Sequence, residues 1–361
     1  MKTLLITLEY PPFKGGVANY YSNLAKYWPL EERIQVLDNA RESLLSTNSR
    51  FSWLKTVSVL VKEIRTRGFD YLLVGQILPL GTAAWLATFI KPFKYGVILH
   101  GLDFNSALES SHKRFLAKLI LKKADKIICA NSRLAELVKN FNGDLANKIK
   151  IVNPGIDPII SLPSTEGLNN LQDTYNLKDY FVLFTLGRLV LRKGVDSVIK
   201  AMSNWGTEDL KIKYFIAGSG KEEKYLRSLA AVSPLSESII FLGELTEEEK
   251  WLWLHACDLF VMPVREIGPD FEGFGIVYLE ANLAGKLVLA GNSGGVKDAV
   301  EDGINGFLVN PENIEEIRNK IIELKNNRNL LLELGENAKK RAVDKFNWEG
   351  QARRLCEIIK E

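Results

Sequence analysis

Residues 181–194 read FVLFTLGRLVLRKG, an apolar run that passes into a loop with one glycine, followed by a pair of cations and a second glycine. The run Phe181–Leu186 carries no charge, which is typical of a strand buried on both faces of a parallel sheet. The loop after it opens a helix, so the order is strand, loop, helix. This order predicts one repeat of an α/β fold, in which helices cover the sheet.

The same order recurs along the whole chain of 361 residues, which is too long for one ordinary hydrophobic core. Repeated strand–helix units predict parallel sheets with helices on both faces. The sequence therefore predicts two Rossmann-like, doubly wound domains facing a central cleft. Strands are expected at residues 4–8, 71–74, 95–99 and 126–130 in the first domain, and at 181–186, 213–217, 239–241, 259–262 and 287–290 in the second.

A linker is predicted at residues 153–172, which lack clear periodicity and hold three prolines and two glycines. This places the first domain at residues 1–165 and the second at 166–345. After about Ile314 the chain is expected to be helical.

The composition is that of a folded globular protein, with 46% hydrophobic and 25% charged residues. Three cysteines without a close pair argue against a disulfide framework and a zinc site, and favour a reducing, cytoplasmic location. The apolar run at residues 77–90 is shorter than the roughly 20 residues that span a bilayer, and it contains Pro79 and Gly81. It is therefore interpreted as a buried helix.

Positive charge is concentrated in the first half of the chain. Residues 1–165 carry 22 Lys and Arg against 13 Asp and Glu, whereas the remainder carries 25 against 31. Much of this charge lies in residues 113–123, where Phe115 and Ile120 are expected on one helical face, with Lys118 and Lys122 on another. Such a helix could rest on an anionic membrane surface, or it could face the core with a solvated lysine side.

Ligands of doubly wound sheets bind at the carboxyl ends of the strands, so the loops there are the candidate sites. The first strand leads through Gly15 and Gly16 into a helix, where backbone N–H groups could bind a phosphate, although a tight turn alone would also explain the glycines. The spacing is not Gly-x-Gly-x-x-Gly, which counts against a dehydrogenase.

In the second domain, Arg188 and Lys193 could straddle a pyrophosphate, Arg188 through its planar fork and Lys193 as a point charge. Cations at the start of a helix oppose its dipole, so a bound anion is the favoured explanation over plain surface charge.

Further along, Gly273 and Gly275 precede a helix. If Glu272 lies in the loop before that helix, it can reach a sugar while Glu280 meets ribose hydroxyls, because a carboxylate accepts from two hydroxyls at once. An exposed helical position for Glu280 remains the alternative.

A histidine follows the strand at residues 95–99. This residue, His100, is a candidate for contact with substrate or for a structural role.

Together these motifs resemble the retaining glycosyltransferase family 4 of the GT-B superfamily, including its phosphatidylinositol mannosyltransferase-like and glycan-biosynthesis members, over essentially the full chain. The resemblance rests on Glu9-Tyr10-Pro11-Pro12, Gly15-Gly16, His100-Gly101, residues 153–157 (NPGID), Gly187-Arg188, Lys193-Gly194, the pair Glu272 and Glu280, and residues 292–295 (NSGG).

The resemblance implies a role for each candidate residue. Arg188 and Lys193 would bind the donor diphosphate, Glu280 the ribose and Glu272 the transferred sugar, while His100 would contact that sugar near the reacting carbon. Backbone and base contacts would come from Gly15, Gly16, Leu245, Phe274, Gly275 and Ile276. The last helix, residues 346–361, would pack back on the first domain.

By the same resemblance, a hexose passes with retention from a nucleotide-diphosphate sugar to a glycan or lipid-linked acceptor. GDP-mannose is weakly favoured over a UDP-hexose. No metal or other cofactor is expected, since Asp270-Phe271-Glu272 is only a loose approximation to Asp-x-Asp. No nucleic-acid partner is expected, and peripheral contact with the inner membrane face stays open. The alternatives are a nucleotide-sugar epimerase of the same architecture and a non-catalytic nucleotide-sugar-binding protein.

Overall fold

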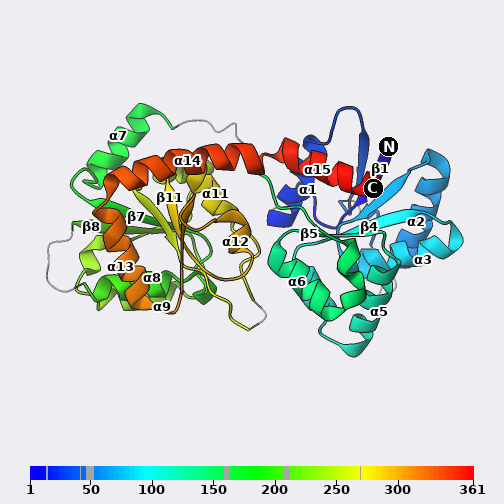
Figure 1. Ribbon diagram of the computed structural model, residues 1–361, viewed down its shortest axis with the longest axis horizontal. Helices are drawn as coiled ribbons and strands as arrows, with labels where there is room; N and C mark the ends of the chain where they lie inside the picture. The colour runs from blue at the N-terminus through cyan, green and yellow to red at the C-terminus, as the bar shows by residue number, and fades with distance from the viewer. Residues whose placement is uncertain (14, 41, 46–52, 158–162, 206–210, 269) are drawn as a thin grey trace. The chain divides into compact units, whose positions relative to one another are not determined.

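The computed structural model describes residues 1–361 except 14, 41, 46–52, 158–162, 206–210 and 269. The chain divides into two compact units (Figure 1). The first comprises Met1–Gly155 and Phe346–Glu361, and the second comprises Ile156–Lys345. The division therefore falls after Gly155 rather than after residue 165.

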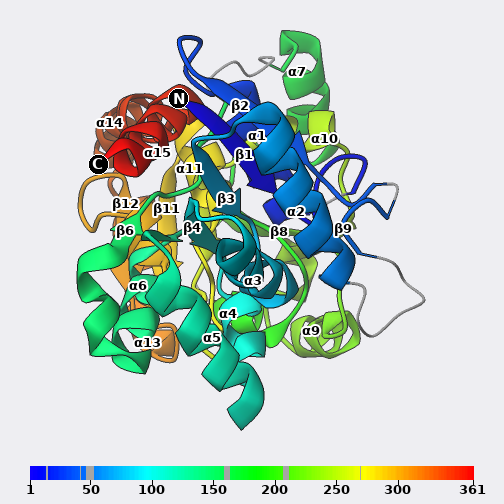
Figure 2. The same ribbon diagram turned by 90° about the vertical axis from the view of Figure 1, so that its right-hand side faces the viewer.

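The first unit contains a six-stranded sheet with the order β2-β1-β3-β4-β5-β6, in which all neighbours are parallel. The chain adds strands in opposite directions on either side of β1 and β3, so the topological switch point lies between these two strands. Figure 2 looks onto this unit and shows β1, β3 and β4 next to one another. The strands are β1 (Lys2–Ile6), β2 (Arg33–Leu37), β3 (Tyr71–Val74), β4 (Lys94–Leu99), β5 (Lys126–Cys129) and β6 (Ile149–Ile151).

Helices cover both faces of this sheet, and each face has its own hydrophobic core. One face is covered by α2 (Trp53–Arg67), α3 (Thr82–Ile90), α4 (Leu102–Ala107), α5 (Ser111–Lys123) and α6 (Ser132–Phe141), with short turns η1 (Ile77–Gly81) and η2 (Gly143–Lys148). The other face is covered by α1 (Gly16–Lys26) and by α15 (Trp348–Lys360), which pack against each other (Figure 1).

Trp348, at the start of α15, lies directly against Gly155. A Cβ atom at Gly155 would lie 2.7 Å from Cδ2 of Trp348, so only glycine fits there. Gly155 is the last residue before the chain leaves the first unit, and Trp348 follows soon after its return. The points of exit and re-entry are therefore adjacent within this unit.

The second unit contains another parallel six-stranded sheet, with the order β12-β11-β10-β7-β8-β9. Its switch point lies between β7 and β10, which pair directly. Two doubly wound parallel sheets confirm the predicted α/β class. The strands are β7 (Phe181–Leu186), β8 (Ile212–Ala217), β9 (Ile239–Gly243), β10 (Leu259–Met262), β11 (Leu287–Gly291) and β12 (Gly306–Val309).

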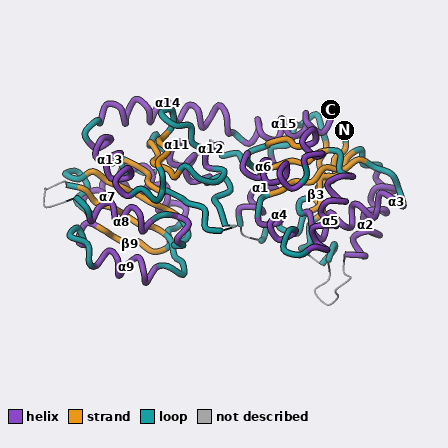
Figure 3. Tube along the Cα trace, turned by 60° about the horizontal axis from the view of Figure 1, so that its bottom comes forward, coloured by secondary structure: helices purple, strands orange, loops and turns teal. Residues whose placement is uncertain are grey.

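Helices again lie on both sides of the strands, as the purple and orange segments of Figure 3 show. On one side, α8 (Val195–Ser203) contacts α9 (Glu223–Ala231) and α13 (Ile314–Lys325). On the other, α10 (Glu247–Ala256) contacts α7 (Thr165–Thr174) and α11 (Ile276–Leu283), and α11 contacts α12 (Val296–Ala299). The remaining elements are η3 (Leu191–Lys193), η4 (Ser236–Ser238) and α14 (Arg328–Phe346).

Several sequence expectations need correction. The strands β2, β6 and β12 were not predicted, because β2 is a half-buried edge strand, β6 has three residues and β12 begins with glycine. The predicted linker overlaps most of α7, whose start is capped by Ser164 accepting from the N–H of Gly167 at 3.0 Å. Residues 158–162 of that linker lie outside the described residues.

Two predicted helices also differ from expectation. Residues 77–90 form η1 followed by α3, because Pro79 interrupts the helix, and Phe89 and Ile90 at its end are exposed. In α5 the buried residues are Ala117, Ile120 and Leu121, whereas Phe115 is 62% exposed. The prediction that Phe115 lies on the same buried face of α5 as Ile120 is therefore wrong. Within the described parts of the chain, none of the helices combines the length and the apolar character needed to cross a membrane.

Candidate functional site

A buried carboxylate with two cations marks the switch point of the second unit. Glu272 lies in the loop between β10 and α11, and its side chain is 13% exposed. The Nζ atom of Lys193, at the end of η3 after β7, donates to Oε2 of Glu272 at 2.7 Å. Arg192 donates to the same oxygen through Nη1. The structure thus brings together two residues that the sequence analysis assigned separately, the diphosphate cation Lys193 and the sugar carboxylate Glu272.

The electrostatics of this cluster favour the ionised carboxylate. Burial alone would raise the pKa of Glu272, but the charges and hydrogen bonds of Lys193 and Arg192 outweigh burial and hold this pKa below its usual value. The backbone of Glu272 is also fixed, since its carbonyl accepts from the N–H of Gly295 at 2.9 Å. A Cβ atom at Gly294 would lie 2.5 Å from that carbonyl oxygen, so this loop needs glycine to approach.

Sequence reasoning missed Arg192. Its side chain is 7% exposed, and its Nε atom forms a second ion pair, 3.1 Å from Oδ1 of Asp270. The available signal was its place beside Lys193 in a loop at the carboxyl end of a strand. A guanidinium buried between two carboxylates is suited to holding both in place.

Arg188 is placed differently from Lys193. It lies two residues after the end of β7, it is exposed, and its guanidinium forms no ion pair or hydrogen bond with another described residue. The side chain of Lys193 crosses over the neighbouring Gly187, where a Cβ atom would lie 3.7 Å from Nζ. One loop therefore presents a free guanidinium next to an ammonium that is already paired.

Glu280 lies inside α11 and is paired rather than freely exposed. Its Oε1 atom accepts from Nζ of Lys250 in α10 at 2.8 Å, and the two side chains are 20% and 14% exposed. Burial would lower the pKa of Lys250, but Glu280 and Glu247 outweigh burial and raise it. The ion pair holds the Glu280 carboxylate at a fixed place on α11.

Glycine controls the start of α11. Gly275 has φ +77° and forms the N-cap, and a Cβ atom there would lie 2.5 Å from the Tyr278 ring. Phe274 is buried, whereas Ile276, the first helical residue, is 42% exposed. Leu245 is half-buried and precedes α10, whose N-terminus is capped by Thr246 and Glu249. All these predicted donor-binding positions lie at the carboxyl ends of β9 and β10.

In the first unit, His100 follows β4 and is enclosed by aromatic side chains. Its ring centroid lies 4.8 Å from that of Tyr20 and 5.2 Å from that of Tyr21, both at edge-on angles. Burial lowers the pKa of His100 to about 4, which keeps the imidazole neutral near pH 7. The backbone N–H groups of His100 and Gly101 both donate to Oδ1 of Asp103 at 3.0 Å. Burial raises the pKa of Asp103 to about 6.

Gly15 and Gly16 are exposed at the N-terminus of α1. A Cβ atom at Gly16 would meet nothing within 4 Å among the described residues, so packing does not demand glycine here. The first turn of α1 has no acidic residue, and Gly15 offers no side-chain cap. The amide groups of this turn are thus available to a ligand. Lys14 lies outside the described residues.

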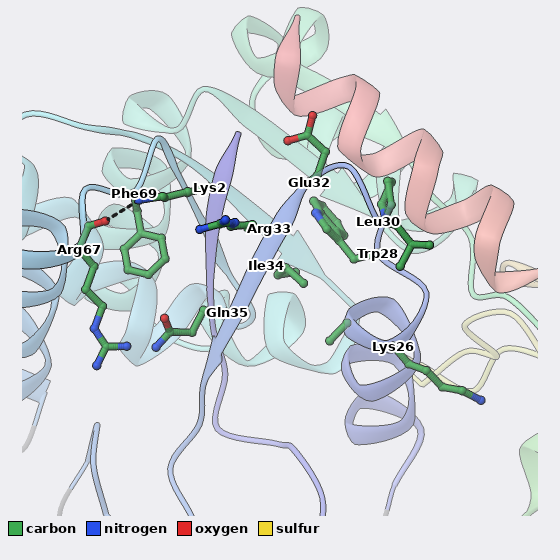
Figure 4. Close-up of a pocket in the computed structure, with 12 residues that line it drawn as sticks. Lys2, Lys26, Trp28, Leu30, Glu32, Arg33, Ile34, Gln35, Arg67 and Phe69 are labelled. Carbon is green, nitrogen blue, oxygen red and sulfur yellow. Dashed lines mark hydrogen bonds between the residues drawn. The ribbon is translucent and has the colours of Figure 1, made fainter.

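A pocket of 540 Å³ lies elsewhere in the first unit (Figure 4). Its lining includes Lys2 and Arg33, the first residues of the parallel strands β1 and β2. The pocket therefore lies at the amino-terminal ends of these strands, whereas His100 follows the carboxyl end of β4. Figure 4 shows Lys26 pointing away from it, and Lys2 donates to the carbonyl oxygen of Arg67 at 3.4 Å. This pocket shares no residue with the predicted site. No group of three or more His, Cys, Asp and Glu residues placed to hold a metal ion occurs in the described ranges.

The chain is similar to known glycosyltransferases in sequence and in fold. The family described as Glycosyl transferases group 1 matches residues 169–341. A GDP-mannose-dependent alpha-(1-6)-phosphatidylinositol monomannoside mannosyltransferase of Mycolicibacterium smegmatis is 31% identical over 374 residues, covering 99% of this chain and 97% of the relative. An uncharacterized glycosyltransferase of Methanocaldococcus jannaschii is 28% identical over 363 residues, covering 97% and 95%. In fold, the solved structure of Anabaena HepE in complex with UDP matches with a TM-score of 0.81 at 21% identity, covering 100% of both chains.

Proposed function

Because the chain belongs to the group 1 glycosyltransferases, which have the GT-B fold, we propose that it transfers a hexose, with retention of anomeric configuration, from a nucleotide-diphosphate sugar. The observation that carries the proposal is the cluster of Glu272, Lys193 and Arg192 at the switch point between β7 and β10. It places a fixed carboxylate beside cations where doubly wound sheets bind nucleotides.

In this proposal, Arg188 and Lys193 bind the diphosphate and stabilise the charge that develops on it as the sugar leaves. Arg188 is free to do so, whereas Lys193 must turn from Glu272 toward the diphosphate. Arg192 then keeps Glu272 in place for the transferred sugar. The incoming hydroxyl attacks from the face that the diphosphate leaves, and the diphosphate accepts its proton, so no metal is required.

The remaining residues complete the donor site in the same proposal. Glu280 binds the ribose hydroxyls, held in position by Lys250. Leu245 lies against the base, and the open N-terminus of α11 at Gly275 and Ile276 offers backbone N–H groups to the sugar. In the first unit, His100 contacts the transferred sugar, and Gly15 and Gly16 offer N–H groups to the diphosphate.

We propose GDP-mannose as the donor to test first and a UDP-hexose as the second. The GDP-mannose dependence named for the mycobacterial relative supports the former, and the UDP complex of HepE supports the latter. The name of the mycobacterial relative also supports a lipid-linked acceptor. On α5, the exposed Phe115 lies among Arg114, Lys118 and Lys122, a combination suited to contact with an anionic membrane surface.

The test incubates the chain with GDP-mannose or UDP-glucose and with phosphatidylinositol mannoside or glycan acceptors. We expect release of the nucleoside diphosphate together with a mass gain of one hexose on the acceptor, unchanged by EDTA. Conversion of the donor sugar without acceptor would favour an epimerase, and tight donor binding without consumption would favour a non-catalytic binding protein. Sedimentation with phosphatidylglycerol vesicles tests the membrane contact, with Phe115→Ser expected to weaken it.

A further inference from the structure

A buried tyrosine on α1 contacts the imidazole of His100. Tyr21 lies on α1 and is 0% exposed. Its hydroxyl lies 2.6 Å from the carbonyl oxygen of Gly75, directly after β3, and 2.9 Å from Nε2 of His100, directly after β4. Three segments that are distant in sequence therefore meet in one hydrogen-bond chain beside the switch point of the first sheet.

The protons in these two hydrogen bonds of Tyr21 can be assigned by counting donors. A carbonyl oxygen can only accept, so the single proton of the Tyr21 hydroxyl is donated to Gly75. The Tyr21 oxygen then has only lone pairs to offer to His100, so Nε2 must carry a hydrogen. A neutral imidazole carries one such hydrogen, which leaves Nδ1 as an acceptor. In the described residues, Nδ1 has no hydrogen-bond partner.

Packing holds the Tyr21 hydroxyl at the carbonyl. A Cβ atom at Gly75 would lie 3.0 Å from both Cζ and the hydroxyl oxygen of Tyr21, so glycine permits this close approach. Burial raises the pKa of Tyr21 well above its ordinary value, which keeps the hydroxyl protonated. Tyr20 packs edge-on against the same imidazole, but its buried hydroxyl has no hydrogen-bond partner among the described residues. Only one of the two neighbouring tyrosines therefore controls the protons of His100.

We propose that Tyr21 is a positioning residue that holds His100 in its Nε2–H tautomer, so that Nδ1 accepts a hydrogen bond from a hydroxyl of the transferred sugar. The part of this inference that concerns the sugar rests on the proposed function of His100. The part that concerns the tautomer depends only on the contacts within the first unit. In the opposite tautomer, Nδ1 would carry a hydrogen and would meet the sugar hydroxyl as a donor.

The experiment is NMR on the full chain labelled with ¹⁵N-histidine. It records the correlations between the nitrogens of each imidazole ring and the protons bound to its carbons. The spectrum of His100→Gln identifies the signals of His100 among those of the three histidines. Wild type is expected to show the Nε2–H tautomer. Tyr21→Phe, which keeps the ring and removes the hydroxyl, is expected to give a mixture of tautomers and to lower kcat about tenfold, the size of one lost hydrogen bond, with the donor KM little changed. Tyr20→Phe is the matched control and should alter neither readout.

An Nδ1–H tautomer in the wild type would overturn the proposal, as would a Tyr21→Phe variant that keeps both the wild-type tautomer and the wild-type kcat. Because the wild-type spectrum needs no variant, poor folding of Tyr21→Phe leaves the proposal falsifiable. Failure of the wild-type chain to consume any donor would refute the proposed function while leaving the tautomer readable. An equal loss of kcat in Tyr20→Phe and Tyr21→Phe would point to packing around the imidazole and would reject a specific role for the Tyr21 hydroxyl.

Discussion

Each of the two doubly wound sheets has one switch point, and the residues near the two switch points differ in chemistry. In the second unit, Glu272 accepts from Lys193 and Arg192, so charges of opposite sign meet in a largely buried place. In the first unit, Tyr21, Gly75 and His100 form a hydrogen-bond chain without a net charge. Two doubly wound sheets with different strand orders thus hold one cluster of paired charges and one chain of neutral hydrogen bonds.

This difference determines how each site should respond to substitution. Charges stabilise a charged transition state strongly, so removal of one cation from the second unit should slow the reaction most. A neutral hydrogen bond contributes less to free energy but fixes a direction. The comparison can be tested by measuring kinetics, stability and pH dependence on both sides.

The largest effect is expected from Arg188→Ala and Lys193→Ala. Each removes a cation from the proposed diphosphate site, and loss of one such contact costs about 3 kcal/mol, roughly a hundredfold in kcat/KM. Steady-state kinetics with the active donor measure this loss, and circular dichroism checks the fold. Lys224→Ala, on the exposed side of α9, serves as the control. Near-normal activity in both site variants would remove the contrast between the two units.

An intermediate effect is expected from Arg192→Met, which leaves Glu272 with Lys193 as its remaining cation. Loss of a buried charge-assisted contact should lower the free energy of unfolding by about 2 kcal/mol. Turnover should fall roughly tenfold, since Glu272 is then less well held for the sugar. Urea denaturation and kcat measure the two effects. If stability falls while kcat stays at the wild-type value, Arg192 has a structural role alone.

A smaller effect is expected from Glu280→Gln, which weakens a contact made equally in the ground state and the transition state. The donor KM should rise roughly fivefold, about 1 kcal/mol, with kcat nearly unchanged. Glu247→Gln is a matched control, because Glu247 pairs with the same Lys250 but is 74% exposed. A fall in kcat with unchanged KM would contradict the assignment of Glu280 to the ribose.

The smallest effect concerns pH. Burial lowers the pKa of His100 from 6.5 to about 4, so the unfolded chain binds more protons there between these values, and stability should fall as pH drops through this window. Asp103 has the opposite sign, because its pKa is raised from 3.8 to about 6 and it stabilises the folded chain at low pH. The Tm of wild type and His100→Gln, followed from pH 7 to 4, isolates the histidine. Parallel curves would show that His100 is not buried in its neutral form.

Much of the fold follows from local patterns. Uncharged apolar runs such as Phe181–Leu186 and Leu259–Met262 are buried on both faces, and such strands carry an unmistakable pattern. The edge strand β2 escaped prediction, because it has no fully buried residue and Arg33 and Gln35 interrupt its apolar side chains. The helix α7 escaped it too, since Leu168 and Leu171 are its only apolar side chains and none of its residues is fully buried.

The candidate site was predictable in its residue types but not in its contacts. Glycines and cations after strands pointed to Arg188, Lys193 and Glu272, and the expected glycosyltransferase family is confirmed by the relatives. The pairing of Lys193 with Glu272 spans 79 positions and depends on β7 lying beside β10. The contact of Tyr21 with His100 also spans 79 positions and likewise needs the completed sheet. Such partners are invisible to local spacing.

The contact of Gly155 with Trp348 has an engineering consequence. Because the chain departs and returns at one spot, residues 156–345 form an uninterrupted insertion into the first unit. Insertions with adjacent ends can be exchanged without cutting through the host sheet. The half of the molecule that would choose the nucleotide sugar is thus a cassette, which recombination could replace while the half bearing His100 keeps its own continuous core.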